Sequence, residues 1–349
     1  MKVDYLIVGQ GLAGSLLAWQ LLRRNKRILV VDRDETVTSS KIAAGLVTPI
    51  TGSKFSISPA FEERLNFARQ FYRDLELATG TPFFHEQRIA KLLRNVKEKD
   101  NWEAIDRSEE SSDHPYRGPL DLDPSLLHAE NGGFEMKGGG WLDVPAFLET
   151  TRQHLLERAS YAIGKVNSAE VHPHSTGVQW KNINAKQIIF AEGWRNHENQ
   201  FFDWIRMHSA LGDILDVRIP GLDGLELIIN KGAWLLPVGG DRFRTGSNYR
   251  HQLASLDPDH AGREEIIEKL RSITPLPFEV IDHRCAVRPI IHRSQIFAGI
   301  HPAHDSVAFF NGLGSKGVVN GPWYAERFTQ LLEDGIPLPP ESDIQSNLV

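Results

Sequence analysis

The first 33 residues of the chain carry two apolar runs separated by a glycine-rich turn. Residues 3–8 read VDYLIV, residues 9–14 read GQGLAG, and residues 27–31 read RILVV. Between the turn and the second run, apolar side chains recur close to helical spacing over residues 12–24. This pattern predicts a strand, a tight turn, a helix and a second strand, which Asp32 closes.

Longer apolar patterns follow at both helical and strand periods. Residues 59–79 predict a helix with one apolar face, and residues 143–158 predict another, with Asp143 as N-cap and Pro145 in the first turn. The run at 186–194 has no alternation, which is typical of a strand covered on both faces. Shorter runs predict an antiparallel sheet, at 212–217, 225–229, 233–237 and 242–246.

A second glycine-rich segment lies near the end of the chain. Residues 307–311 predict a strand, residues 312–317 read GLGSKG, and a helix is expected from about Pro322 to Leu332. Backbone N–H groups at the start of a helix can bind anions. The chain has two such glycine-rich helix starts, far apart in the sequence, which suggests that they hold one ligand from both ends.

Together these patterns predict an α/β protein with a Rossmann-type dinucleotide-binding domain and a second domain built on an antiparallel sheet. The first domain is expected to be discontinuous, comprising residues 1–80, 140–206 and 285–349. The second domain is expected at residues 81–139 and 207–284. The antiparallel sheet of the second domain would then carry the substrate pocket.

The N-terminal glycines and Asp32 have the arrangement that a dinucleotide requires. Gly9 permits a tight turn, Gly11 lets the backbone approach a pyrophosphate, and Gly14 lets the helix pack closely on the strand. Asp32 is placed to accept hydrogen bonds from the hydroxyls of an adenosine ribose. A plain βαβ turn is the alternative, and the pattern alone leaves open whether the dinucleotide is FAD or NAD.

Composition narrows the range of partners and compartments. The net charge of −6 gives no global basic field for nucleic acid or anionic lipid. Cys285 is the only cysteine, which excludes an intramolecular disulfide and fits a reducing compartment. No apolar run approaches the ~20 residues that span a bilayer, and the first strand leaves no room for a signal peptide, so we expect a cytoplasmic protein. His292, His301 and His304 lack supporting acids at fixed spacing, so no metal site is expected.

The ordered set of short segments resembles the D-amino-acid oxidase superfamily of FAD-dependent oxidoreductases, and most of all its glycine oxidase and sarcosine oxidase branch. The resemblance rests on residues 9–32, AAGL at 43–46, AEGW at 191–194, VRP at 287–289 and GLGSKG at 312–317. It implies a glutathione-reductase-like FAD fold with noncovalent FAD. It also implies oxidation of a carbon–nitrogen bond of a small amino acid or secondary amine, by hydride transfer to the flavin. No second glycine fingerprint for a nicotinamide cofactor is present.

The resemblance also assigns residues to the cofactor. It implies that Leu12, Ala13, Asp32 and Arg33 meet the adenosine end and that Val166 supports the adenine. The other implied cofactor contacts are Ser39, Ser40, Ala44, Gly45, Leu46, Gly193, Trp194, Gly312, Leu313, Gly314, Ser315, Lys316, Gly317 and Val318.

For the substrate, the resemblance implies that Arg288 holds a carboxylate, because a planar guanidinium can donate two parallel hydrogen bonds to it. An ion pair between domains is the alternative for Arg288. Trp234 is implied to lie over the flavin, and Lys316 to steady the flavin or polarise an acceptor; a structural role is the alternative for both. Some relatives bind flavin through a cysteine just before the arginine, but Cys285 is one residue out of register and is expected to be an inert buried thiol. At Ser315 the sequence departs from glycine oxidase, which has a second substrate arginine there.

Other functions stay open at this level. AGLVTP at 44–49 with GSKG at 314–317 also resembles the oxidase half of the bifunctional enzyme that acts on carboxymethylaminomethyl-uridine, so tRNA is a second candidate substrate carrier. Oxidation of a 2-hydroxy acid through the same arginine is another alternative. A flavin-binding protein without catalytic activity is the last. The electron acceptor and the oligomeric state stay open too.

Overall fold

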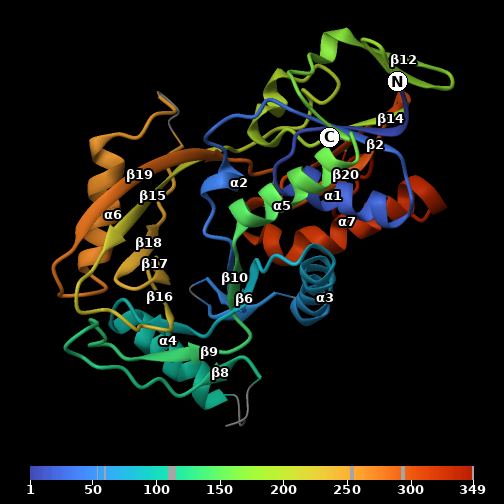
Figure 1. Cartoon of the computed structure of the whole chain (residues 1–349). Helices are drawn as coiled ribbons and strands as arrows, with labels where there is room; N and C mark the ends of the chain where they lie inside the picture. Colours follow the sequence, from blue (N-terminus) through green and yellow to red (C-terminus); the bar gives the residue numbers. More distant parts are fainter. Residues whose placement is uncertain (53, 59, 109–114, 252–254, 292–294, 348–349) are drawn as a thin grey trace.

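The structure, a computed structural model, describes residues 1–52, 54–58, 60–108, 115–251, 255–291 and 295–347. It contains two large sheets that lie side by side, with helices between and around them (Figure 1). Within the described ranges, no helix is both long enough and apolar enough to cross a bilayer.

The first sheet has a parallel centre. Its strands are β1 (Lys2–Val8), β2 (Ile28–Asp32), β11 (Tyr161–Ile163), β12 (Val171–His174), β13 (Gly177–Trp180), β14 (Ile183–Phe190), β20 (Phe297–His301) and β21 (His304–Asn311). The parallel strands lie in the order β11, β2, β1, β14, β21. β20 adds to β21 and the β12–β13 hairpin adds to β14, both antiparallel. Strands that are distant in sequence therefore meet at the centre of this sheet.

The central strands of this sheet are buried on both faces, as the run at 186–194 predicted for β14. Ile7 and Ile189 point into one core, which also contains residues of the flanking helices. Val8 and Phe190 point into the opposite core, together with Phe202. Because neighbouring residues of a strand face opposite sides, a strand with two buried faces is apolar throughout.

The helices are α1 (Leu12–Arg23), α2 (Ser39–Ile42), α3 (Phe61–Thr79), α4 (Val96–Ser108), α5 (Val144–Glu157), α6 (His260–Arg271) and α7 (Gly317–Asp334). α1 packs against both α5 and α7 beside the first sheet (Figure 1). The side chain of Asp143 accepts a hydrogen bond from the N–H of Ala146 at 3.0 Å, which confirms the predicted start of α5.

The second sheet is mainly antiparallel, as predicted. Its order along the sheet begins with β19 (Glu279–Arg288), β15 (Ala210–Arg218), β18 (Arg242–Gly246), β17 (Ala233–Gly239) and β16 (Ile228–Lys231), and ends with β7 (Ile89–Leu92), β9 (Gly133–Met136) and β8 (Arg117–Gly118). Only β16 and β7 are a parallel pair within it. α6 covers its outer side against β15, β17 and β18 (Figure 1). The boundary expected at residue 285 falls inside β19, so Arg288 ends a strand of this sheet.

Short strands connect the two large sheets. β3 (Leu46–Val47), β10 (Gly140–Leu142) and β6 (Phe84–Glu86) form one small sheet, and β4 (Ile50–Thr51) pairs with β5 (Ser56–Ile57). They place residues 44–52 and 54–57 between the first sheet and the second.

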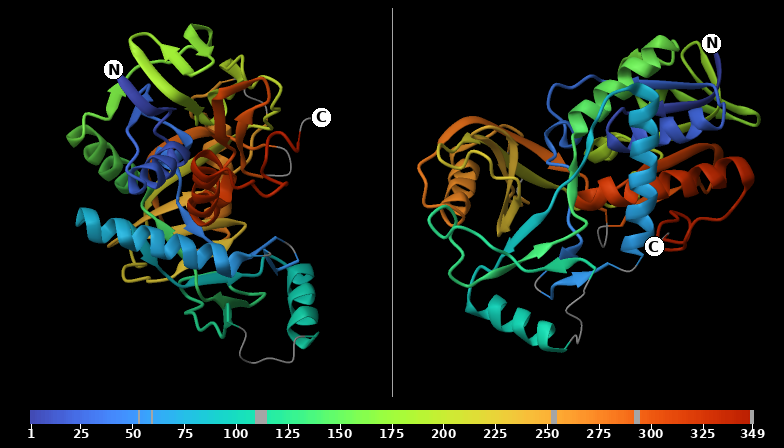
Figure 2. Two further views of the ribbon diagram at one scale, coloured as in Figure 1. Left: turned by 90° about the vertical axis from the view of Figure 1, so that its right-hand side faces the viewer. Right: turned by 60° about the horizontal axis from the view of Figure 1, so that its bottom comes forward.

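The expectation that the last helix starts at Pro322 is wrong, because α7 begins at Gly317 and contains Pro322. A proline inside a helix has no N–H, so the carbonyl four residues earlier loses its partner. Here that carbonyl belongs to Val318, and the hydroxyl of Tyr72 donates to it at 2.9 Å. Tyr72 comes from α3, which lies across α7 (Figure 2). A contact from a distant helix therefore makes the early proline tolerable.

We predict that Tyr72→Phe lowers the free energy of unfolding by about 1–3 kcal/mol, because it leaves the buried Val318 carbonyl without a partner. Urea unfolding followed by circular dichroism measures this. Tyr161→Phe is the matched control, since the buried Tyr161 hydroxyl has no hydrogen-bond partner. We expect its removal to be nearly neutral, and an equal loss in both variants would contradict the assignment.

Candidate active site

A cavity of about 650 Å³ lies between the two sheets. The turn at residues 9–13 and Asp32 line it from the first sheet. Trp234 and Arg288 line it from the second sheet, and residues 313–318 lie on its wall as well. The two glycine-rich helix entries therefore open onto the same space.

Close backbone contacts shape the turn between β1 and α1. Gly9 has a φ of +101°, and a Cβ atom there would lie 2.6 Å from the carbonyl oxygen of Ala191. A Cβ atom on Gly14 would lie 1.9 Å from the carbonyl oxygen of Gly9. Only glycine fits at both positions. Gly11, the N-cap of α1, has no side chain to cap the helix, and the Leu12 N–H donates to the hydroxyl of Ser40 at 3.1 Å. This end of the helix faces the cavity, where a helix N-terminus can bind an anion such as a pyrophosphate.

Asp32 is held in one orientation at the end of β2. Its two carboxylate oxygens accept hydrogen bonds from the N–H groups of Gln10 at 2.6 Å and Asp34 at 2.7 Å. A carboxylate oxygen can accept more than one hydrogen bond. Asp32 therefore retains capacity for ribose hydroxyls on the cavity side, where Arg33 and Val166 also lie.

Glu192 also lines the cavity, and sequence reasoning assigned it no role beyond its place in AEGW. Burial raises the pKa of Glu192 to about 7, although the amide of Asn199 donates to it at 2.9 Å and the Arg33 guanidinium lies 3.7 Å away. Burial dominates because an ionised carboxylate loses its hydration there. Nothing in a linear pattern reports such burial.

The segments expected along the flavin line the cavity, with two exceptions. Gly14 lies behind the turn, and Gly312, with a φ of +81°, packs where a Cβ atom would be 2.5 Å from Ile291. Both shape the backbone and do not face the cavity. The lining positions are Gly9, Gly11, Leu12, Ala13, Asp32, Arg33, Ser39, Ser40, Ala44, Gly45, Leu46, Val166, Gly193, Trp194, Leu313, Gly314, Ser315, Lys316, Gly317 and Val318.

β19 places Arg288 and Cys285 on opposite sides. Ala286 and Arg288 line the cavity, whereas Cys285 and Val287 pack against Leu211 on the other face. Burial raises the pKa of the Cys285 thiol to about 11, and its sulfur lies 3.2 Å from the carbonyl oxygen of Leu256. A thiol that faces away from the cavity and stays protonated cannot bind a flavin there covalently.

Arg288 is a partly buried cation without a counter-ion among the described residues. One guanidinium nitrogen, Nη2, donates to the hydroxyl of Ser247 at 3.1 Å, while Nη1 is buried and has no hydrogen-bond partner. The guanidinium carbon lies 4.2 Å from the centre of the Tyr249 ring. Burial lowers the pKa of Arg288, and no carboxylate in the described part of the chain forms an ion pair with it. The interdomain ion pair is therefore not found among these residues, and an anion bound at this wall of the cavity would supply the missing negative charge.

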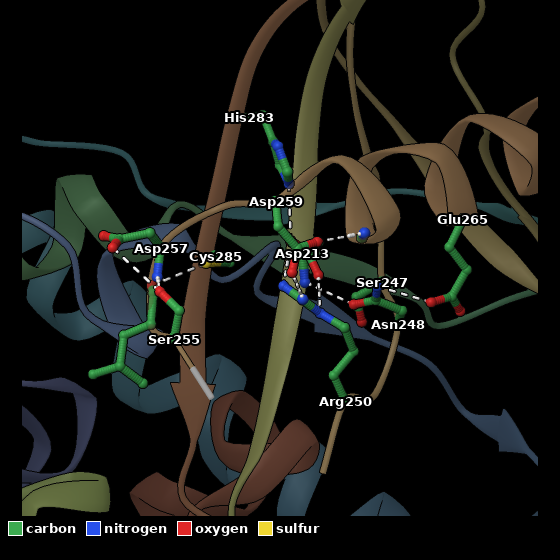
Figure 3. Close-up of polar contacts among 12 residues, drawn as sticks. Asp213, Ser247, Asn248, Arg250, Ser255, Asp257, Asp259, Glu265, His283 and Cys285 are labelled. Atoms are coloured by element: carbon green, nitrogen blue, oxygen red, sulfur yellow. Dashed lines mark hydrogen bonds and ion pairs between the residues drawn. The ribbon is translucent and has the colours of Figure 1, made fainter. Parts of the chain in front are cut away.

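A polar network around Asp213 holds the segment that carries Ser247, Asn248 and Arg250 (Figure 3). Asp213, fully buried on β15, lies 2.9 Å from Nε of Arg250 and 2.8 Å from Nε2 of His283. The Asn248 side chain accepts a hydrogen bond from the Asp213 N–H at 2.8 Å. Asp213 thus anchors residues on both sides of Tyr249, so that segment stays against Arg288.

Trp234 and Lys316 line the cavity from opposite walls. Trp234 on β17 is paired with Gly246 on β18, where a Cβ atom would lie 3.0 Å from the indole. The ammonium of Lys316 donates to the hydroxyl of Ser58 at 2.8 Å, and burial lowers its pKa. Lys316 therefore ties the start of α7 to the loop around β5.

The histidines do not form a metal site within the part of the chain that the structure describes. His301 and His304 stack at the turn between β20 and β21, with ring centres 4.9 Å apart. His292 lies outside the described residues.

Comparisons with known proteins agree with this geometry. A family model described as FAD dependent oxidoreductase matches residues 4–331. The fold is similar to glycine oxidase from Geobacillus kaustophilus (TM-score 0.80, 18% identity, covering 98% of each chain) and to iminodiacetate oxidase from Chelativorans sp. BNC1 (TM-score 0.80, 16% identity, covering 97% of this chain and 98% of that one). A curated relative, the tRNA 5-methylaminomethyl-2-thiouridine biosynthesis bifunctional protein MnmC of Shewanella amazonensis, is 21% identical over 96% of this chain. The chain spans 57% of that relative's length.

The chain therefore belongs to the D-amino-acid oxidase family of FAD-dependent oxidoreductases. It is an FAD-dependent enzyme with a Rossmann-type FAD-binding sheet and a second, mainly antiparallel sheet. The residues present fit the cofactor, because the glycine cradle, the N-terminal end of α1 and the oriented Asp32 carboxylate lie along one cavity.

We predict that Glu192→Gln changes how stability depends on pH. In the folded protein the pKa of Glu192 is about 7, above its ordinary value of 4.5. Wild-type stability should therefore fall as the pH rises from about 4.5 through 7, by about 1–3 kcal/mol, and the glutamine variant should lack this fall. Urea unfolding of the FAD-free protein at pH 5 and pH 8 measures the difference.

Glu333→Gln is the control for that measurement. Glu333 on α7 is partly buried, yet hydrogen bonds from Lys26 and Tyr5 lower its pKa below its ordinary value of 4.5, and its charge does not act on Glu192. Its contribution to stability is complete above 4.5 and is lost only as the pH falls through the lowered pKa. The Glu333 variant should therefore keep the wild-type slope between pH 5 and pH 8. A wild-type slope in the Glu192 variant would contradict the assignment.

Proposed function

We propose that this protein oxidises the carbon–nitrogen bond of a small amino acid or secondary amine that carries a carboxylate. The observation that carries the proposal is the partly buried guanidinium of Arg288, which lines the cavity and has no carboxylate partner among the described residues. A substrate carboxylate would supply the missing negative charge and accept hydrogen bonds from this guanidinium. The two structural neighbours are named for the oxidation of glycine and iminodiacetate, which are both carboxylated amines.

The residues around Arg288 fix the plane of its guanidinium. Ser247 accepts from Nη2 and the Tyr249 ring lies against the flat face, so Nη1 points in one direction. Gly212 leaves room beside the guanidinium, because a Cβ atom there would lie 2.5 Å from Nη2. A substrate held by its carboxylate is thereby oriented before the reaction begins.

Trp234 and the glycine opposite it form a flat wall beside this anchor. The wall excludes water from one side of the cavity, so that an uncharged amine next to the carboxylate lies in an apolar setting. Bound FAD would supply the electron acceptor for the bond that is oxidised. The chain itself then has to bind, orient and shield the substrate, and a dedicated acid–base pair is not required.

We predict that Arg288→Lys lowers kcat/KM for a carboxylated amine by about 100-fold, because an ammonium cannot donate two parallel hydrogen bonds from one plane. FAD should remain bound. Anaerobic reduction of the flavin by glycine, N-methylglycine and 2-hydroxy acids, followed by absorbance, measures this and also tests the hydroxy-acid alternative.

Arg284→Lys is the matched control, since Arg284 lies on the same strand but pairs with Asp216 and Asp282 and does not line the cavity. The substrate should reduce the flavin of this variant at the wild-type rate. Unchanged kinetics in Arg288→Lys would remove the carboxylate anchor. Flavin reduction by hydroxy acids alone would replace the amine with an alcohol as substrate, and no reduction by any class would favour a non-catalytic flavoprotein.

A second candidate is a secondary amine carried by tRNA, which the curated relative supports through its alignment over 96% of this chain. The net charge of −6 opposes it. We predict no retention of tRNA by the FAD-loaded protein at physiological salt in a filter-binding assay. Retention that weakens steeply with added salt would favour the tRNA-borne substrate.

A further inference from the structure

A row of paired residues crosses the cavity face of the second sheet. Lys91 on β7 is paired with Asn230 on β16, and Asn230 is paired with Trp234 on β17. Trp234 is in turn paired with Gly246 on β18. Directly paired residues on neighbouring strands place their side chains on the same face. All four line the cavity.

Lys91 brings a second uncompensated positive charge to this row. Its ammonium donates to the side-chain oxygen of Asn230 at 3.2 Å, and no carboxylate forms an ion pair with it in the described part of the chain. Burial lowers the pKa of Lys91, while the nearby charge of Glu98 acts in the opposite direction.

Glu98 does not cancel this charge, because another cation already holds it. Arg94 donates to the Glu98 carboxylate from Nε at 2.6 Å and from its backbone N–H at 2.9 Å. This closed pair lines the same end of the cavity. The net charge at this end is therefore that of Lys91.

The cationic groups of Arg288 and Lys91 lie a few strand spacings apart. The Arg288 guanidinium contacts Ser247, the residue that follows β18, and the Lys91 ammonium contacts Asn230 on β16. β18 and β16 are separated only by β17, which carries Trp234. The Arg288 guanidinium also lies against Gly212 on β15, the strand beyond β18. Strands in a sheet lie about 4.8 Å apart, so the two cationic groups are two to three strand spacings apart, roughly 10–15 Å, across the indole.

We propose that Lys91 and Asn230 form a second anion subsite, which selects amine substrates that carry an additional carboxylate or phosphate beyond the one at Arg288. The inference rests on the proposed function, because Arg288 has to hold the first carboxylate. The reacting amine would then lie between two anionic ends, over Trp234. A substrate as small as glycine reaches Arg288 but leaves the Lys91 charge unpaired.

The test uses the FAD-loaded protein and measures ligand binding by the change in flavin absorbance. The probes are acetate and a series of dicarboxylates from malonate through glutarate and suberate to sebacate. We expect the affinity of the protein for the dicarboxylate to rise in the middle of the series, once the ligand is long enough to reach from Arg288 to Lys91. Lys91→Gln should weaken binding of those longer dicarboxylates about tenfold and leave acetate unchanged.

Two further variants guard against a general structural effect. Lys91→Arg keeps the positive charge and should retain the preference for long dicarboxylates. Asn230→Asp should remove this preference, because the new carboxylate pairs with the Lys91 ammonium and neutralises its charge. Lys137→Gln is the matched control, because Lys137 is exposed beyond the end of β9 and does not line the cavity.

The outcomes separate the subsite from the proposed function. The Lys91 subsite alone is overturned if wild type, Lys91→Gln and Asn230→Asp bind long dicarboxylates equally well and still bind acetate. If acetate and the whole series fail to perturb the flavin in wild type, the Arg288 anchor fails first. Tighter binding of ω-phosphonocarboxylates than of dicarboxylates of matched length would assign the second group as a phosphate.

Discussion

The close approach of three backbone segments at the start of α1 governs the rest of the structure. Gly9 lies against the carbonyl of Ala191 and Gly14 lies against the carbonyl of Gly9, with no room for a side chain at either position. This contact fixes β1, α1 and the end of β14 relative to one another. It leaves the N-terminal end of α1 facing the cavity, and Asp32 is oriented beside it by the backbone of the same turn. One end of the ligand site is therefore set by backbone geometry.

The opposite end of the cavity is set by charge. Most cations near the cavity have acidic partners: Arg33 pairs with Glu198, Arg195 with Glu35, and Arg94 with Glu98. Arg288, Lys91 and Lys316 have no such partner among the described residues; Arg288 and Lys91 lie on strands of the second sheet, whereas Lys316 lies at the start of α7 and donates to Ser58. Burying an unpaired cation costs stability, so its position is informative about the ligand. A dinucleotide held by backbone groups and a substrate held by side-chain charge can then occupy one space without competing for the same contacts.

Local patterns predicted what local interactions determine. The strand, turn and helix at residues 2–23 and the cap at Asp143 follow from short-range spacing, and both are present. The start of α7 was missed because the partner of the Val318 carbonyl is Tyr72, 246 positions away in the chain. The pairing of Lys91 with Asn230 joins strands 139 positions apart and has no local signal. The burial of Glu192 likewise depends on how separate segments close over it.

The order of strands in the first sheet has a consequence for how the protein is made. β1 is synthesised first but lies between β2 and β14, and β14 is flanked in turn by β21, which ends at Asn311. A chain leaving the ribosome cannot complete this sheet until β21 has been translated, and residues 313–318 reach the cavity only after that. Such long-range pairing slows folding and leaves strand edges uncovered in the meantime. The complete flavin site therefore forms only after β21 has joined the sheet.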